Sequence, residues 1–192
     1  MNLINRVKGI LVSPKTEWLV IATENQSMST LITSYTLPLA LVAAAANFIG
    51  YGFIWGAASI TWGLYFAVSV AVSAIISVVI SSYVVDALAP SFGSEKNLNR
   101  SAQLVAYGAT PGIVGSVLNI FPPIAFIGML FALYGIYLWY LGLTPIKKTP
   151  DDKRIAYLVV CFVVLFVVYF LIGLVFSFLL MPALGLSLAA AI

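Results

Sequence analysis

The sequence has no histidine and one cysteine, Cys161, which lies inside an apolar run. Histidine is the commonest metal ligand and proton shuttle, and a lone cysteine cannot form a disulfide within its own chain or build a metal cluster. The only adjacent acids, Asp151 and Asp152, lie beside Lys153 and Arg154, where a solvated charge cluster is expected. No acid–base pair, no nucleophile with its base and no metal set is visible. The sequence therefore predicts a non-enzymatic protein without a metal or other cofactor.

Charged residues are scarce too. They make up 8% of the 192 residues, whereas an ordinary soluble domain carries roughly a quarter. Hydrophobic residues reach 62% and the mean hydropathy is +1.11. A hydrocarbon core of roughly 30 Å requires apolar runs of about twenty residues, and the chain contains such runs. The composition predicts an all-α polytopic membrane protein, with residues 1–192 forming a single membrane domain in contact with the lipid bilayer and with no nucleic-acid partner.

Five segments are long and apolar enough to be predicted as transmembrane helices. They are residues 30–50, 62–85, 102–119, 124–143 and 155–181. The third contains Pro111, which removes one backbone hydrogen bond and clashes with the preceding turn. Neighbouring helices can satisfy the freed carbonyl, so a kinked span is expected there.

The charges have a one-sided pattern. Every Lys and Arg lies in the N-terminal segment, in 91–100 or in 144–154, and five spans place these three segments on one face. The opposite face, formed by 51–61 and 121–123, carries no charge. Because cytoplasmic loops are enriched in Lys and Arg, the N-terminus is predicted to be cytoplasmic and the C-terminus to lie outside. Aromatic residues are expected to mark the two interfaces, with Trp55 and Trp62 outside and Tyr107, Trp139, Tyr140 and Tyr157 inside.

The N-terminal segment, 1–24, has the pattern of two short interfacial helices. Apolar residues from Leu3 to Leu11 recur at helical spacing, with polar residues on the other faces, which is typical of an amphipathic helix. Ser13 suits a helix N-cap and Pro14 suits the first helical position. A second short helix is therefore expected to begin at this corner.

This helix pair is predicted to lie on the inner membrane surface, with Lys15 and Glu17 in water and Trp18 at the headgroup level. Two roles stay open for it: a structural anchor, or a docking surface for a cytoplasmic protein partner. The residues predicted to contact the membrane surface or such a partner are Arg6, Lys8, Lys15, Trp18, Asp86, Lys147 and Lys148.

Four short stretches follow one another along the chain: ILVSPKTEW at 10–18, DALAPSFG at 86–93, AYGATP at 106–111, and FPP with FALYGIYLWYLGL at 121–143. In this order, and with the five-span layout, the sequence resembles the Yip (Ypt/Rab-interacting protein) domain family, in particular its compact prokaryotic branch. Eukaryotic members resemble adaptors: five-span Golgi and ER proteins that associate with prenylated Rab-type GTPases and assemble with one another.

The chain departs from those eukaryotic members in two places. Only a short segment precedes its first span, and it has DALAP at 86–90 where they carry DLYGP. The resemblance therefore implies the five-span fold, an inner-membrane location in a prokaryote and a non-enzymatic role.

The second span carries the most regular polar pattern of the chain. Ser69, Ser73, Ser77 and Ser81 recur every four residues and form one stripe along a helix. Small residues allow close helix packing, and serine can hydrogen-bond across helices or to its own backbone. The stripe is either a packing seam or the polar lining of a pathway for water, an ion or a lipid headgroup.

Glycines form a similar pattern in the fourth span. Gly128, Gly135 and Gly142 are seven residues apart and line up as a groove against which another helix must pack. The sequence leaves open whether that helix is an internal neighbour or belongs to a second copy in a homo-oligomer.

Two further features lie in the third span and at the inner end of the second. Gly108, Pro111 and Gly112 make the third span thin and breakable, as in the discontinuous helices of some transporters, or simply kinked to fit its neighbours. Asp86 is the only acid within a predicted boundary of a span, at the inner end where water can reach it. It is expected to pair with Arg100 across the short loop.

An adaptor or scaffold fits this pattern best. The charge faces the cytoplasm, small residues pack the spans, and an amphipathic segment lies on the inner surface. We therefore expect a non-enzymatic integral membrane protein that organises membrane or protein partners at the cytoplasmic face. The alternative is a transporter or channel for a small solute, ion or lipid, using the serine-lined second span and the kinked third span.

Overall fold

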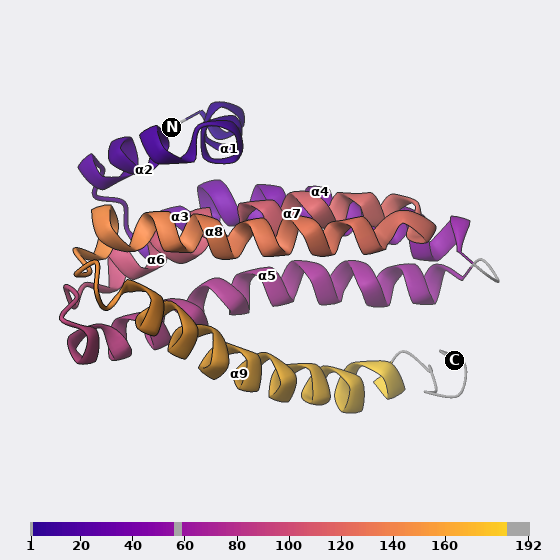
Figure 1. Cartoon of the computed structure of the whole chain (residues 1–192). Helices are drawn as coiled ribbons and strands as arrows, with labels where there is room; N and C mark the ends of the chain where they lie inside the picture. The colour runs from indigo at the N-terminus through magenta and orange to yellow at the C-terminus, as the bar shows by residue number, and fades with distance from the viewer. Residues whose placement is uncertain (1, 56–58, 184–192) are drawn as a thin grey trace.

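The computed structural model describes residues 2–55 and 59–183, and these are helical without strands. The α-helices are α1 (Leu3–Val12), α2 (Pro14–Thr23), α3 (Met28–Leu31), α4 (Leu37–Ile49), α5 (Ile60–Leu88), α6 (Leu98–Gly108), α7 (Thr110–Gly115), α8 (Gly128–Lys147) and α9 (Arg154–Ala183). Single π-helical turns, Ile32–Thr36 and Gly50–Ile54, flank α4, and 3₁₀ turns occupy Ala89–Phe92, Ser116–Ile120 and Pro122–Ile127. Figure 1 shows the helices running lengthwise beside one another, with α1 and α2 on one side and α9 diverging from α5.

Four helical stretches of the described residues are long and apolar enough to cross a membrane: Met28–Ile54, Ile60–Phe92, Pro122–Lys147 and Arg154–Leu174. They coincide with the first, second, fourth and fifth predicted spans. Most of these stretches are longer than predicted, because π-helical or 3₁₀ turns extend the α-helices at their ends.

The third predicted span is interrupted. It consists of α6, α7 and the turn Ser116–Ile120, and the break falls at Ala109. Pro111 lies in the first turn of α7, where its missing N–H costs no helical hydrogen bond. The Tyr35 hydroxyl lies 2.6 Å from Thr110 Oγ1 and holds the break against the first span. The predicted weakness at Pro111 is thus confirmed, although the helix stops and restarts instead of bending.

This interrupted segment forms the core of the bundle. Every residue from Ser101 to Gly108 is buried. A Cβ added at Gly108 would lie 2.2 Å from Trp139 Cδ1, so only glycine allows α6 to approach α8 this closely. Close packing, not hydrophobicity alone, brings these helices together, because lipid tails are as apolar as the side chains.

The glycine groove of α8 is filled from within the chain. A Cβ at Gly128 would lie 3.2 Å from the Gly115 carbonyl oxygen, and a Cβ at Gly135 would lie 3.0 Å from that of Gly108. Of the two alternatives, the internal neighbour therefore occupies this groove.

The segment 98–120 joins the two ends of the bundle. Near its start, the Asn97 carbonyl accepts a hydrogen bond from Lys147 Nζ at 3.3 Å. Near its end, Asn119 Nδ2 donates to Asn47 Oδ1 at 3.0 Å. The segment thus runs between the same two levels as the long helical stretches Met28–Ile54 and Pro122–Lys147.

Candidate functional site at the charged end of the bundle

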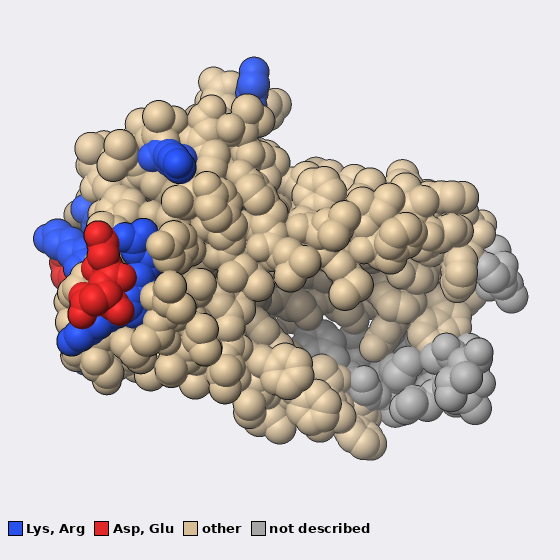
Figure 2. Space-filling view, viewed as in Figure 1, with Lys and Arg blue, Asp and Glu red and all other residues tan. Residues whose placement is uncertain are grey.

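Charged residues gather at one end of the bundle, which we call the charged end: the loops 93–97 and 148–153 with the C-terminal part of α2 and the adjoining ends of α5, α6 and α8. Figure 2 shows most of the blue and red side chains there and none on the opposite part of the visible face. The loops within 91–100 and 144–154 are therefore brought together as predicted, and the end of the N-terminal segment joins them at Arg100.

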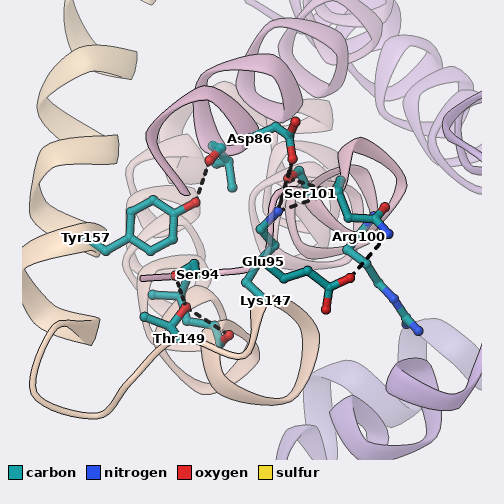
Figure 3. Close-up of polar contacts among 11 residues, drawn as sticks. Asp86, Ser94, Glu95, Arg100, Ser101, Lys147, Thr149 and Tyr157 are labelled. Carbon is teal, nitrogen blue, oxygen red and sulfur yellow. Dashed lines mark hydrogen bonds and ion pairs between the residues drawn. The ribbon is translucent and has the colours of Figure 1, made fainter. Parts of the chain in front are cut away.

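A buried ion pair lies at the centre of this end (Figure 3). Lys147 Nζ donates to Asp86 Oδ1 at 3.2 Å, to Ser101 Oγ at 2.7 Å and to the Asn97 carbonyl at 3.3 Å. The Lys147 side chain is 0% exposed and that of Asp86 13%. The three partners use all three ammonium protons and connect α5, α6 and α8.

The predicted Asp86–Arg100 pair is wrong. Arg100 Nη1 instead donates to the carbonyls of Ala22 and Glu24, each at 2.9 Å. The last carbonyls of a helix lack intrahelical partners and carry negative partial charge, so a guanidinium is well suited to them. Arg100 therefore fixes the end of α2 to α6.

A second ion-pair cluster holds α1 against α2. Arg6, only 6% exposed, pairs with Glu17 and Glu24, and its guanidinium lies 5.3 Å from the ring centre of Tyr107. Glu17 is thus half-buried in an ion pair, which corrects the prediction that it lies in water. Lys15 is exposed as predicted.

Trp18 is covered by protein and does not face lipid headgroups, which corrects the prediction of an interfacial anchor. It is 1% exposed, in a slot over Gly142, where an added Cβ would lie 2.9 Å from Trp18 Cε2 and Cζ2 and 2.6 Å from Leu104 Cδ1. The absence of a side chain at Gly142 creates the slot. The third glycine of the α8 groove therefore receives a side chain from α2.

The predicted docking residues divide into two groups. Arg6, Trp18 and Lys147 are buried and largely shielded by the protein itself, and Asp86 is nearly so, which removes them as docking contacts. Lys8, Lys15 and Lys148 are exposed, as are the apolar residues Ile4, Val12 and Leu19 of the first two helices. The exposed face of α2 is mixed, with Leu19 and Val20 beside Lys15 and two threonines.

The two loops of the charged end are tied to each other. Ser94 Oγ donates to Thr149 Oγ1 at 2.8 Å, and Lys148 Nζ lies 2.7 Å from Glu95 Oε2. The hydrogen bond from Lys148 holds the pKa of the Glu95 carboxyl below its usual range. Because most of Lys148 faces solvent, this pair is screened and weak.

The serine stripe of α5 faces α9. The Tyr169 hydroxyl lies 2.5 Å from Ser77 Oγ and also contacts Ser81 Oγ. Ser69 and Ser73 line a cavity of about 440 Å³ between α5 and α9, and Ser69 Oγ has no hydrogen-bond partner among the described residues. Sequence analysis missed Tyr169, although a phenol inside a long apolar run was a signal that a polar partner lies nearby.

A second cavity, of about 420 Å³, lies on the other side of Tyr169 between α8 and α9, with the α6–α7 break at its floor. Gly108 and Gly112 both line it. A Cβ at Gly112 would meet no atom within 4 Å, so this glycine is not required for packing.

No group of three or more Cys, Asp or Glu side chains within the described ranges is placed to hold a metal ion. Several membrane-crossing helices in the part of the chain that the structure describes, with the charge gathered towards one end, define a polytopic integral membrane protein that contacts the bilayer. The chain belongs to the Yip1 domain family, whose model matches residues 8–175. No curated protein and no solved structure matches it.

Proposed function

We infer that this protein is a non-enzymatic membrane adaptor or scaffold, a single membrane domain that presents its charged end to the cytoplasm and organises protein or lipid partners there. The observation that carries the proposal is the firm attachment of α1 and α2 to the charged end. Trp18, Arg6 and Arg100 fix the two helices to the bundle, so their exposed lysines and apolar side chains form a preorganised surface. A preorganised surface binds with less loss of conformational freedom than a mobile tail.

The proposed topology has five crossings. Segment 98–120 is added to the four long helices because it reaches from the charged end to Asn47 at the other end. A broken crossing helix is tolerated where protein surrounds it, and residues 101–108 of α6 are all buried. With five crossings and all Lys and Arg either at the charged end or on the adjoining helices α1 and α2, the N-terminus lies in the cytoplasm and, in a prokaryote, the membrane is the inner one.

The helix pair α1–α2 is proposed to lie in the headgroup layer of the cytoplasmic leaflet. Its exposed apolar side chains Ile4, Val12 and Leu19 would enter the acyl region, while Lys8 and Lys15 attract anionic headgroups, at about 1 kcal/mol each. Deleting 1–24 is a poor test of partner binding, because it would also open the buried slot at Gly142.

Site-specific photo-crosslinking in living cells tests the adaptor role. A photoreactive amino acid replaces Lys8 or Lys15 on the helix pair beside the charged end, or Lys148 at the charged end itself, and Phe121, which is 48% exposed at the other end, serves as the control. We expect one recurring protein adduct from the charged end and none from position 121. Protein adducts of equal yield from both ends, or lipid adducts alone, would refute a specific cytoplasmic partner.

A transport function is the second candidate, and the cavities beside the serine stripe favour it. Single cysteines at Ser69, Ser73, Ser77 and Ser81 in a Cys161→Ser background, probed with a charged impermeant maleimide, test for water in the stripe. Labelling at the two positions in the middle of the stripe, Ser73 and Ser77, together with solute flux in liposomes, would support transport over the adaptor role.

A further inference from the structure

A narrow groove separates α5 from α9 within the membrane-spanning part of the bundle. Its volume is about 440 Å³, and its walls run from Tyr65 to Ser77 on α5 and from Tyr169 to Gly173 on α9. The two walls belong to helices that both qualify as membrane spans. Figure 1 shows α9 diverging from α5 along this stretch.

The depth of the groove follows from helix geometry. Taking Trp62 in the first turn of α5 as an interfacial anchor, Ser81 lies about 28 Å further along the helix, close to the roughly 30 Å thickness of the hydrocarbon core. Ser81 therefore lies near the boundary at the charged end. The groove from Ser77 towards Tyr65 is about 18 Å long and extends from there into the hydrocarbon.

The width of the groove selects its occupant. A volume of about 440 Å³ for the centres of water molecules over about 18 Å gives those centres a mean cross-section of roughly 24 Å², about 5 Å across. Adding the water radius of about 1.4 Å at each wall makes the groove about 8 Å wide. An α-helix with side chains is about 10 Å across, so neither a span of a second copy nor another helix of this chain fits. A hydrocarbon chain, whose contacts with neighbouring carbons are about 4 Å long, fits this width.

The lining and its polar end agree with a lipid. The walls expose mainly apolar atoms, which disfavours a file of water. At the end near the charged loops, the hydroxyls of Ser77, Ser81 and Tyr169 lie together. Hydroxyl protons can rotate, so this cluster can turn a donor towards an ester carbonyl at the level where lipid esters lie.

We propose that the α5–α9 groove binds one acyl chain of a phospholipid from the leaflet at the charged end, with the ester carbonyl of that lipid at the Ser77–Tyr169–Ser81 hydroxyls. This site goes beyond the adaptor role and does not depend on it. The groove begins about 6 Å inside the boundary at Ser81 and ends at Tyr65, about 24 Å from that boundary, so a chain that fills its whole length passes the bilayer midplane by about 9 Å.

The test uses the full chain in nanodiscs made with a phospholipid that carries a diazirine midway along one acyl chain. After irradiation, mass spectrometry locates the adducts. We expect adducts on the facing walls, 65–77 and 169–173. Gly173→Phe fills the groove from the α9 wall, and nothing lies within 4 Å of a Cβ at this position, so the variant has room to fold. It should abolish the adducts on the α5 wall.

Leu171→Phe is the matched control, because Leu171 is 54% exposed and does not line the groove; it should leave the α5 adducts unchanged. Should Gly173→Phe not fold, Ser73→Phe against Val72→Phe makes the same comparison on α5. Unchanged α5 adducts in the filled variant would overturn the proposal. Maleimide labelling of Ser73→Cys would also overturn it, because it would show that water fills the groove. A disulfide between two copies of Ser73→Cys would overturn it as well, because it would show that a second protomer lies there.

Discussion

The buried pair of Asp86 and Lys147 should have the largest effect on stability of any charged contact in the chain. Asp86→Ala would leave the Lys147 ammonium, which is 0% exposed, with only a serine hydroxyl and a backbone carbonyl as partners. Breaking a buried ion pair costs about 3–5 kcal/mol. Because Ser101 and Asn97 continue to accept from Nζ, we expect the lower part of that range, about 3 kcal/mol.

Lys147→Met should cost less, about 1–2 kcal/mol, since the Asp86 carboxylate keeps its hydrogen bond from Ser101 Oγ and part of its hydration. The double variant removes both charges and should be more stable than Asp86→Ala alone, with a coupling free energy of about 2 kcal/mol. Equilibrium unfolding of the purified protein in mixed micelles measures these differences.

Lys148→Met is the matched control, because the neighbouring Lys148 side chain is 77% exposed and should matter by less than about 0.5 kcal/mol. The ion pair would not join the three helices as described if Asp86→Ala destabilised the protein no more than Lys148→Met. The same would follow if the destabilisation of the double variant equalled the sum of those of Asp86→Ala and Lys147→Met.

Gly142→Ala should displace Trp18 from its slot and destabilise the protein by about 1–3 kcal/mol. In a variant that keeps Trp18 as its single tryptophan, the fluorescence of Trp18 should shift to the red. An unshifted spectrum would contradict the packing of Trp18 over Gly142. Tyr169→Phe should cost about 1 kcal/mol by removing the hydroxyl that bridges the two serines, measured by thermal unfolding against the wild type. The Glu95–Lys148 pair should stabilise the fold fully above the ordinary Glu pKa of 4.5 and lose its effect as the pH falls through the lowered folded-state pKa. Glu95→Gln should therefore differ from the wild type by a few tenths of a kcal/mol at pH 7 and not in acid, and a difference that persisted at low pH would contradict the pairing.

The sequence predicted the features that depend on one-dimensional patterns. The distribution of charges along the chain was enough to predict that 91–100 and 144–154 lie at one end. The poor fit of proline inside a helix predicted the break near Pro111. The long apolar runs identified four of the helices, because length and hydropathy alone decide whether a helix can cross a bilayer.

The partners of individual side chains were not predictable in this way. Arg100 was assigned to Asp86 because the two are close in sequence, whereas Lys147 reaches Asp86 from the end of another helix. Trp18 looked interfacial because an apolar helix face has the same pattern whether it meets lipid or protein. Its burial depends on Gly142, which no local pattern connects to α2.

The most direct test of the account concerns the crossing of 98–120. Single cysteines at Lys96 and Phe121, both exposed and at opposite ends of this segment, are introduced in a Cys161→Ser background and probed with an impermeant maleimide. The account predicts that the cysteine at position 121 reacts in intact spheroplasts and that the one at position 96 reacts only after permeabilisation. Reaction of both from the same side would show that the segment does not cross, and would contradict the five-span topology and the cytoplasmic placement of the charged end.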